Sequence, residues 1–148
     1  LRLYGVETAF QYGPWSLQGE YMAAEPEGPF IGKRWLEAGY VHSSYRLTGE
    51  HRPYDTESGS FDGVEPRRLF HLGDFRGWGA WEVGLRYSWL DLNDGPIRGG
   101  FMEDYTLGLN WYLNPNTRIM WNYILSNVEH DLYEGDVEVF ETRFQVTF

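Results

Sequence analysis

The sequence contains no cysteine, so the fold is held without disulfide bonds, which suits passage through an oxidising compartment. No run of about 18 apolar residues is present, and this excludes a membrane-spanning helix. Of the 12 basic residues only Lys33 is a lysine, and the 12 are too dispersed for nucleic-acid binding. No segment has a convincing helical period. Strands are therefore the regular structure to look for.

Residues that could support catalysis or bind a metal are scattered along the chain. The four histidines, His42, His51, His71 and His130, lack the spacing of metal ligands. The acid–histidine–acid sequence at residues 129–131 has no serine motif to accompany it. No Gly-rich phosphate loop precedes a helix. We therefore expect no enzyme activity, no metal and no cofactor.

The C-terminal segment, residues 137–148, has one apolar and one polar side. Phe140, Phe144 and Val146 share a parity with the terminal Phe148, whereas the intervening positions from 141 onward are polar. A strand of a soluble sandwich can alternate in this way, but it has no reason to end on an aromatic residue. The closing strands of outer-membrane barrels do end on one. We interpret Phe144, Val146 and Phe148 as an assembly signal for such a barrel.

The same alternation recurs in residues 80–92, 104–113 and 118–126. Each segment is about ten residues long, which is enough for a tilted strand to cross a bilayer. Only alternate residues of such a strand meet lipid, so the mean hydropathy can be as low as -0.51. Aromatic residues make up 18% of the chain, and many fall near strand ends, where interfacial girdles form. The residues predicted to face lipid are Trp81, Leu85, Trp89, Leu109, Trp111 and Trp121.

The predicted connections are unequal in length. Short turns at residues 12–14 and 114–116 would lie at one end only, the periplasmic end, together with the C-terminus. Residues 48–78 are too long for an ordinary turn, and we predict an excursion at the periplasmic rim with room for a short strand. Longer links rich in Gly, Pro and acid would form external loops at the other end. These links are residues 23–33, 93–100 and 129–136.

The third predicted strand, near residues 35–47, is less regular than the others. Its apolar parity, which begins at Leu36, gives way to the opposite parity at Val41. A β-bulge adds one residue to a strand and switches the parity in this way. We therefore predict a bulge near His42.

With first strands near residues 2–11 and 15–22, the chain holds about seven or eight strands in up-and-down antiparallel order. Seven strands leave the first and last parallel, so these two cannot close a barrel by antiparallel pairing. Open edges are not tolerated in lipid. The chain starts at Leu1, with neither an initiating methionine nor a signal peptide, so we expect further strands to precede it. The alternatives are strands from another chain or one within residues 48–78.

Three blocks of residues carry a family resemblance. They are Leu-Thr-Gly-Glu at 47–50 with Arg-Pro-Tyr at 52–54, Gly-Ala-Trp-Glu at 79–82 with Arg-Tyr-Ser at 86–88, and Leu-Gly-Leu-Asn-Trp-Tyr at 107–112. In this order they resemble the carboxy-terminal signature of the phosphate-selective porin O and P family. Residues 13–14 and 18–21 are similar as well, so the resemblance covers most of the chain from about Val6.

The resemblance implies a trimeric outer-membrane porin of about sixteen strands per subunit, of which this chain would be nearly the last half. It also implies that small anions, in some members phosphate or polyphosphate, diffuse through an arginine-lined lumen. In the family, the constricting loop and much of the basic lining belong to the amino-terminal half. The chain as given therefore holds a part of the expected lining.

Polar residues on the inward parity of the strands are the candidates for that lining. Guanidinium groups there can hold a passing phosphate through paired hydrogen bonds and stay protonated. Carboxylates share the same parity, and the more ordinary role of neighbouring Arg and Glu is a cross-strand ladder that stiffens the wall. The net charge of -10 argues against a simple anion funnel. The candidates are Arg86, Arg118, Arg143, Glu82, Asn110 and Glu20.

Two functional classes fit such a transmembrane barrel segment. The first is a porin in the outer membrane of a Gram-negative cell, passing small solutes, anions such as phosphate among them, by passive diffusion. The second is a non-conducting structural or interaction subunit of an outer-membrane assembly. The expected partners are outer-membrane lipid, lipopolysaccharide, the barrel-assembly machinery and, by resemblance, two further copies of the chain. A soluble sandwich or carbohydrate-binding module would leave its apolar strand faces without a polar cover.

Overall fold

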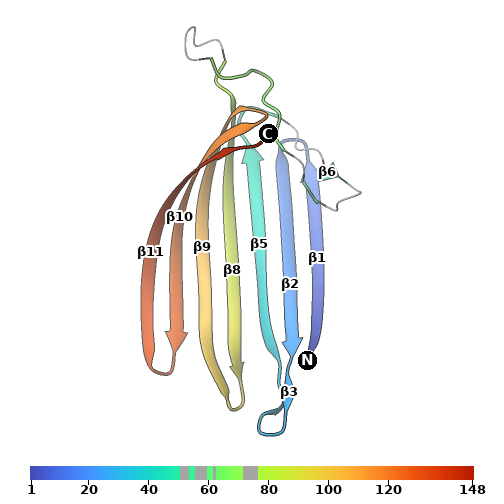
Figure 1. Ribbon diagram of the computed structural model, residues 1–148, viewed down its shortest axis with the longest axis vertical. Helices are drawn as coiled ribbons and strands as arrows, with labels where there is room; N and C mark the ends of the chain where they lie inside the picture. The colour runs from blue at the N-terminus through green and yellow to red at the C-terminus, as the bar shows by residue number, and fades with distance from the viewer. Residues whose placement is uncertain (51–53, 56–59, 62, 72–76) are drawn as a thin grey trace.

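Seven long strands form one curved antiparallel sheet (Figure 1). The structure, a computed structural model, describes residues 1–50, 54–55, 60–61, 63–71 and 77–148. No helix that could span a membrane occurs in these residues. The long strands are β1 (Arg2–Tyr12), β2 (Trp15–Glu25), β5 (Leu36–Arg46), β8 (Ala80–Asp94), β9 (Ile97–Asn114), β10 (Thr117–His130) and β11 (Tyr133–Val146). The short strands are β3 (Glu27–Gly28), β4 (Gly32–Lys33), β6 (Tyr54–Asp55) and β7 (Ser60–Phe61).

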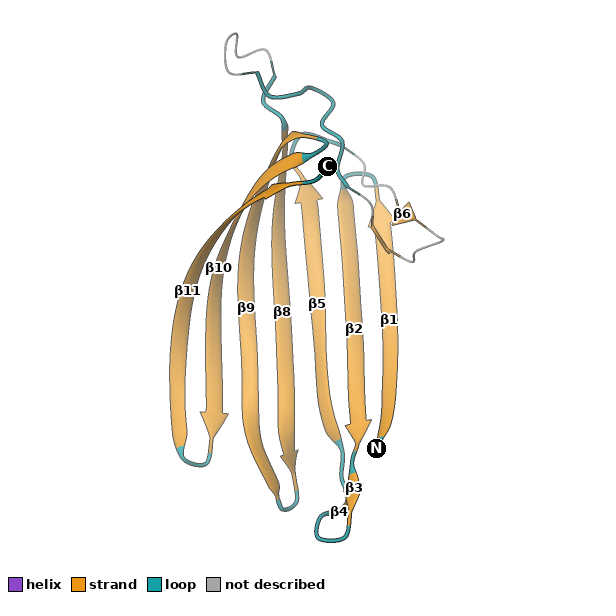
Figure 2. Cartoon of the chain, viewed as in Figure 1, coloured by secondary structure: helices purple, strands orange, loops and turns teal. Residues whose placement is uncertain are grey.

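The long strands follow one another across the sheet in chain order, β1-β2-β5-β8-β9-β10-β11. Each pairs antiparallel with its neighbours, while β3–β4 and β6–β7 form separate two-stranded pairs. The C-terminus lies at the end of the sheet where β1 turns into β2 (Figure 2). The all-β class and the up-and-down antiparallel order are therefore confirmed. The sheet ends on β1 and β11, which run in the same direction.

The cross-strand register separates the side chains into two faces. Leu85 lies opposite Leu107, and the next row pairs Gly84 with Gly108. A Cβ atom on Gly108 would lie 3.1 Å from Oδ1 of Asn122, so this wall has little room for a side chain there. Successive side chains of a strand point to opposite faces. We call the face with Glu82, Gly84, Arg86 and Ser88 the polar face, and the face with Trp81, Val83, Leu85, Tyr87 and Trp89 the apolar face.

Two of the predicted external loops are wrong. Strand β8 continues to Asp94 and β9 begins at Ile97, so Gly95 and Pro96 alone connect them. Strand β10 likewise continues to His130 and β11 begins at Tyr133. The predicted loops at 93–100 and 129–136 are thus mostly strand. Their polar composition is that of hairpins with polar side chains on both faces. Short turns therefore occur at the end opposite the C-terminus as well.

Backbone geometry explains why these hairpins turn tightly. Gly95 has a φ of 58°, which a residue with a side chain rarely adopts. The Asn93 side chain accepts a 3.0 Å hydrogen bond from the Gly100 amide across the hairpin. By contrast, the link between β2 and β5 carries the β3–β4 pair, and it starts after Glu25 rather than at Ala23. The turns at 13–14 and 115–116 are short, as predicted.

The predicted bulge near His42 is also wrong. Strand β5 pairs without a register shift with β2 on one side and β8 on the other. Tyr40 therefore lies on the polar face, and Gly39 and Ser43 lie on the apolar face. Gly39 makes room there for the indole of Trp89, whose ring a Cβ atom would approach to 2.4 Å. The change of parity in the sequence is a change in side-chain chemistry with no change in the backbone.

The long link between β5 and β8 leaves and re-enters the sheet at the C-terminal end (Figure 1). Val64, Ala80 and Tyr112 form a small buried cluster, which places part of this link against the end of the sheet. The β6–β7 pair belongs to the same link. Residues 52–53, in the first of the three sequence blocks, lie outside the described residues. The excursion at residues 48–78 thus starts and ends at the predicted end, while its periplasmic position stays a prediction.

Candidate functional site

The polar face of the sheet is concave. A hollow of about 690 Å³ lies on it and extends from His42 on β5 to Val139 on β11. A hollow that crosses five neighbouring strands requires a sheet curved toward this face, as in the wall of a barrel. Arg86, Asp104 and Asn110 line the hollow between these limits. The concave face is thus a surface on which water and polar solutes can lie.

Arg86 projects into the hollow from β8. Its guanidinium lies over the Tyr40 ring, with Cζ 4.1 Å from the ring centroid. His42 and Thr106 are its register neighbours on β5 and β9. Within the described part of the chain, no carboxylate forms an ion pair with Arg86. A cation held on a π face keeps N–H donors for an acceptor that arrives from solvent.

Arg118 and Arg143 lie on the same face nearer the C-terminal end. The Nε and Nη2 atoms of Arg118 donate to Oε1 of Gln145 at 3.2 and 2.9 Å. Its guanidinium also lies 5.9 Å from the ring centroid of Tyr112. Arg143 faces Met120 across the sheet and is exposed. Neither arginine forms an ion pair with a carboxylate in the described residues, so no side-chain ion pair compensates their charges on the concave side.

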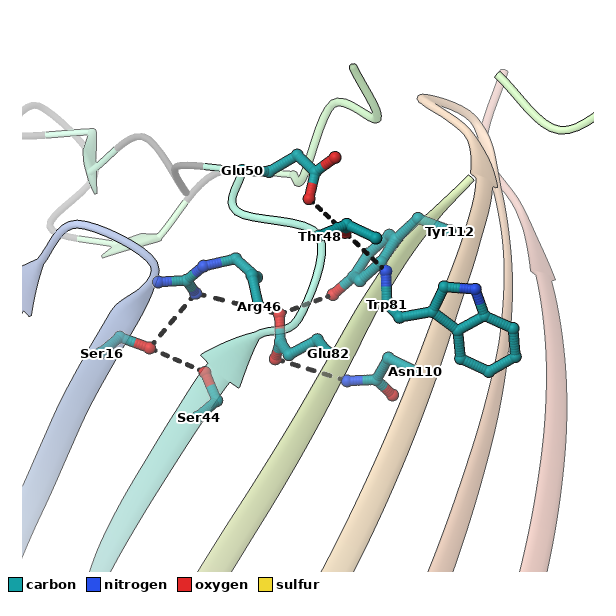
Figure 3. A network of polar contacts seen from close by, with 9 residues as sticks. All are labelled: Ser16, Ser44, Arg46, Thr48, Glu50, Trp81, Glu82, Asn110 and Tyr112. Carbon is teal, nitrogen blue, oxygen red and sulfur yellow. Dashed lines mark hydrogen bonds and ion pairs between the residues drawn. The ribbon is translucent and has the colours of Figure 1, made fainter. Parts of the chain in front are cut away.

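Glu82 is on the polar face, as its parity indicates, but it is only 2% exposed. It faces Arg46, which is fully buried, and Nη1 of Arg46 lies 3.9 Å from its Oε2 (Figure 3). Asn110 and Tyr112 donate hydrogen bonds to the two carboxylate oxygens, at 3.5 and 3.3 Å. On the Arg46 side, Ser16 accepts from Nη1 at 3.4 Å. An Arg–Glu pair across neighbouring strands therefore occurs at this position, and it buries Glu82, whereas Asn110 also lines the hollow.

The buried pair lies beneath residues of the long link (Figure 3). The Thr48 hydroxyl donates to Glu50, and it also accepts a 3.1 Å hydrogen bond from the Trp81 amide. Glu50 is 3% exposed and accepts from the Arg67 amide at 3.3 Å. These contacts join two parts of the link to the end of β8. The incorrect bulge placed Tyr40 on the apolar parity with Leu36. The contacts of Arg46 and Glu50 come from residues distant in the sequence, so no local pattern predicts them.

Glu20 faces another carboxylate. On the polar face it lies opposite Glu7 on β1 and Tyr40 on β5. Gln18 donates a 2.9 Å hydrogen bond to Glu7, and no described cation pairs with either glutamate. Like charges directly opposite one another destabilise a strand pair. This part of the concave face therefore carries uncompensated negative charge.

Toward the end opposite the C-terminus, the concave side of the sheet becomes apolar. Leu36, Ala38 and Leu90 lie there, and they line a hollow of about 250 Å³ with Met22 and Leu92. The charged candidates therefore occupy the rows between this apolar section and the C-terminal end. An aqueous path along the face would meet its charges over that interval.

Indole rings gather on the apolar face near the C-terminal end. Trp81 stacks on Trp111, with ring centroids 4.9 Å apart, and on Trp121 at 6.4 Å. The Trp111 Nε1 group donates to the Trp78 carbonyl at 2.7 Å. At the opposite end of β8, Trp89 stacks on Tyr87 with centroids 5.8 Å apart.

The aliphatic candidates lie between these aromatic groups. Leu85 is 62% exposed, and Leu109 shares its face opposite Val83 and Trp121. All six residues predicted to face lipid therefore lie on one face, Trp81, Leu85, Trp89, Leu109, Trp111 and Trp121. Contact of this face with lipid stays a prediction.

The proposed assembly signal occupies the end of β11 and the residues after it. Phe144 faces Ile119 on the apolar face, and Val146 faces Thr117. The Thr147 amide donates to the Asn116 carbonyl at 2.9 Å, which holds the C-terminus beside the β9–β10 turn. The Phe148 side chain is fully exposed. These aromatic side chains are accessible along the last strand of the sheet, where a recognition factor could reach them.

A family model described as phosphate-selective porin O and P matches residues 2–148. The chain belongs to this family. The match includes both edges of the sheet and all the candidate residues of the concave face. As members of a family of channel proteins, these porins are not enzymes. Family membership also indicates the Gram-negative outer membrane as the location of the chain.

Two curated relatives match nearly all of the chain. Porin O of Pseudomonas aeruginosa is 29% identical over 160 residues, which cover 99% of this chain and 35% of that protein. An uncharacterized protein of Caulobacter vibrioides is 33% identical over 151 residues, covering 98% of this chain and 30% of that protein. The chain thus spans about a third of the length of these relatives.

Proposed function

We propose that the chain forms part of the wall of a water-filled outer-membrane channel through which small solutes, anions such as phosphate among them, diffuse passively. The observation that carries this proposal is the curved sheet with a polar concave face and an apolar outer face edged by aromatic rings. A barrel wall in contact with lipid outside and water inside needs this division. Family membership supports the same function.

Arginines on the concave face supply transient contacts for anions. Arg86 is held by the Tyr40 ring, and Arg118 uses two donor groups on a neutral glutamine oxygen. Both guanidiniums present planar pairs of donors to a phosphate oxygen. Because neither has a carboxylate partner in the described residues, no ion pair has to break when an anion arrives. The contacts can therefore form and release quickly, as conduction requires.

The two sheet edges set the assembly that we propose. Among the described residues, β1 and β11 each pair on one side only, and the backbone groups on their other side cannot be left open in hydrocarbon. Further strands, about sixteen in all by family resemblance, would close the barrel, and three such barrels would form the porin. Outer-membrane lipid and lipopolysaccharide would cover the apolar face. The barrel-assembly machinery would act on the exposed end of β11 with Phe144, Val146 and Phe148.

Planar-bilayer recording of the full-length protein tests this function. We expect discrete conductance steps in potassium chloride and a fall in chloride current when phosphate is added. The variant Arg86→Gln, Arg143→Gln is expected to lower the chloride-to-potassium permeability ratio while the steps persist. Correctly folded protein that gives no steps would contradict the proposal and favour the non-conducting structural subunit.

A further inference from the structure

A cation and a carboxylate line the hollow of the concave face without pairing. Arg86 on β8 and Asp104 on β9 both belong to its lining. Arg86 lies opposite Thr106, and Ser88 lies opposite Asp104, so the two charges are on neighbouring strands in successive register rows. Long side chains can meet across such a diagonal. Among the described residues, however, neither group forms an ion pair.

The Tyr40 ring accounts for the separation of the two charges. Tyr40 lies on β5, on the other side of Ser88 from Asp104 and in the same row. The Arg86 guanidinium lies over this ring, with Cζ 4.1 Å from the centroid, and is therefore held toward β5. On the β9 side, Oδ2 of Asp104 accepts a 3.5 Å hydrogen bond from the Ser88 hydroxyl. Ser88, which also lines the hollow, thus separates a cationic wall from an anionic one.

The part of the hollow on β10 and β11 carries an apolar patch. Ile124, Val137 and Val139 line it there. The register places Ile124 and Val139 in the row of Arg86, and Val137 in the row of Asp104. The apolar patch is therefore beside both charged groups and on the same concave face. A solute that lies in the hollow can contact all three kinds of surface together.

We propose that the hollow is a subsite for zwitterionic amino acids with an apolar side chain, such as leucine. The carboxylate of the amino acid accepts hydrogen bonds from the paired donors of Arg86. Its ammonium group donates to Asp104, and its side chain lies over Ile124, Val137 and Val139. The inference names a class of solute for the channel and rests on the proposed function.

The charges on both sides of the hollow favour a zwitterion over a simple ion. An anion near Arg86 gains attraction from the guanidinium but is repelled by Asp104, and for a cation the two effects are reversed. A zwitterion satisfies both groups, and no ion pair between them has to break first. Each contact is open to solvent and therefore weak. The solute can leave the subsite quickly, as passage through a channel requires.

Current block in planar bilayers tests the inference on the full-length protein. Leucine carries both charges, isocaproate has the same carbon skeleton with the carboxylate alone, and isopentylamine has it with the ammonium alone. We expect leucine to reduce the potassium chloride current by half at a concentration about fivefold lower than either analogue requires. A factor of about five is what one solvent-exposed ion pair contributes at most. This comparison needs no variant of the protein.

Variants then assign each charge of leucine to its partner. Asp104→Asn should abolish the advantage of leucine over isocaproate, and Arg86→Gln its advantage over isopentylamine. Glu20 lies in the row of Asp104, beyond Tyr40 and outside the lining of the hollow. Glu20→Gln is therefore the matched control and should keep both advantages.

A second pair of variants tests the role of the Tyr40 ring. Tyr40→Leu removes the π face that holds the guanidinium, so Arg86 becomes free to pair with Asp104. Leucine should then lose its advantage over both analogues. Tyr40→Phe keeps the ring and should keep the preference for leucine.

The outcomes separate this inference from the proposed function. If leucine blocks the unmodified channel no better than isocaproate does, the inference is wrong and the channel function stands. An equal loss of preference in Glu20→Gln and Asp104→Asn would also overturn the inference, because the total charge of the face would then set the preference. Folded protein that gives no conductance steps would instead contradict the proposed function, and the inference with it.

Discussion

At position 46 an arginine lies opposite Glu82 and is fully buried, whereas at position 86 an arginine lies between His42 and Thr106 and is exposed. The two side chains are chemically the same and share one face of the sheet. Burial beneath the long link commits the first to an ion pair. The second lies over the Tyr40 ring, and no carboxylate among the described residues forms an ion pair with it. The opposing residue therefore decides whether an arginine stabilises the wall or can meet a solute.

Removal of one partner from the buried pair is expected to be strongly destabilising. In Glu82→Gln, the buried ion pair with Arg46 would lose its carboxylate, and breaking such a pair costs about 3–5 kcal/mol in buried sites. Urea unfolding of the lipid-reconstituted protein measures this loss. The double variant Arg46→Met, Glu82→Leu removes both charges and is expected to be close to the unmodified protein. A loss below about 1 kcal/mol for the single variant would mean that water reaches this pair.

A charge placed on the apolar face should oppose membrane insertion. Leu85→Arg and Leu109→Arg are expected to destabilise the inserted state by about 2–4 kcal/mol near mid-membrane. Asn110 follows Leu109 on β9, and its side chain lies on the opposite face of the sheet. Asn110→Arg is therefore the matched control and should insert with a much smaller change. The fraction of folded, heat-modifiable protein on gels after refolding into vesicles reports the difference. Equal tolerance of the charge on both faces would refute the assignment of the apolar face to lipid.

Among the elements, alternation was sufficient to predict the strands but not their ends. Residues 80–92 and 104–113 were recognised because one parity is apolar, yet both strands extend beyond these limits. Once a hairpin is polar on both faces, its alternation disappears and it resembles a loop in sequence. At Tyr40 the error was of another kind. A tyrosine suits either face, and grouping it with the apolar parity of Leu36 predicted the apolar face, whereas it lies on the polar face. The Arg46–Glu82 contact and the anchoring of Glu50 depend on which strands pair, and no local pattern specifies that.

The last strand leads to a prediction about assembly. Deletion of Phe148 removes an exposed aromatic side chain beyond β11 without touching the concave face. We expect slower insertion into the outer membrane and little change in the conductance of barrels that do form. Pulse-chase measurement of heat-modifiable protein, followed by bilayer recording, separates the two effects. Insertion at the normal rate would show that Phe148 is not part of the assembly signal.

The charged side chains of the concave face are grouped differently on different strands. Glu7 and Glu20 lie opposite one another on β1 and β2 with no described cation paired to them, whereas Arg86 and Arg143, on β8 and β11, share their part of the face with Asp104 and Glu141. β1 and β11 are the two edges of the sheet, so these groups lie on different parts of the proposed channel wall (Figure 1). Anions and cations passing along the wall would then meet different local potentials.

Neutralisation of the acidic part is expected to increase anion selectivity. Glu7→Gln, Glu20→Gln should raise the chloride-to-potassium permeability ratio, measured as the zero-current potential in a salt gradient, and more so at low ionic strength. Glu37→Gln, Glu103→Gln removes the same number of charges from the opposite face and is the matched control. Equal shifts from both double variants would show that total charge, rather than the wall facing the solute, sets the ratio.

The two-residue turns between β8 and β9 and between β10 and β11, with the short turn between β9 and β10, also bear on the order of folding. Contacts within these four strands are close in sequence, so forming them closes small loops at a low entropic cost. Pairing of β5 with β8 requires closure of a much longer loop, from Arg46 to Ala80. Proteins dominated by local contacts fold faster than those that depend on distant ones. The four C-terminal strands are therefore expected to nucleate as one unit, onto which β5, β2 and β1 add later.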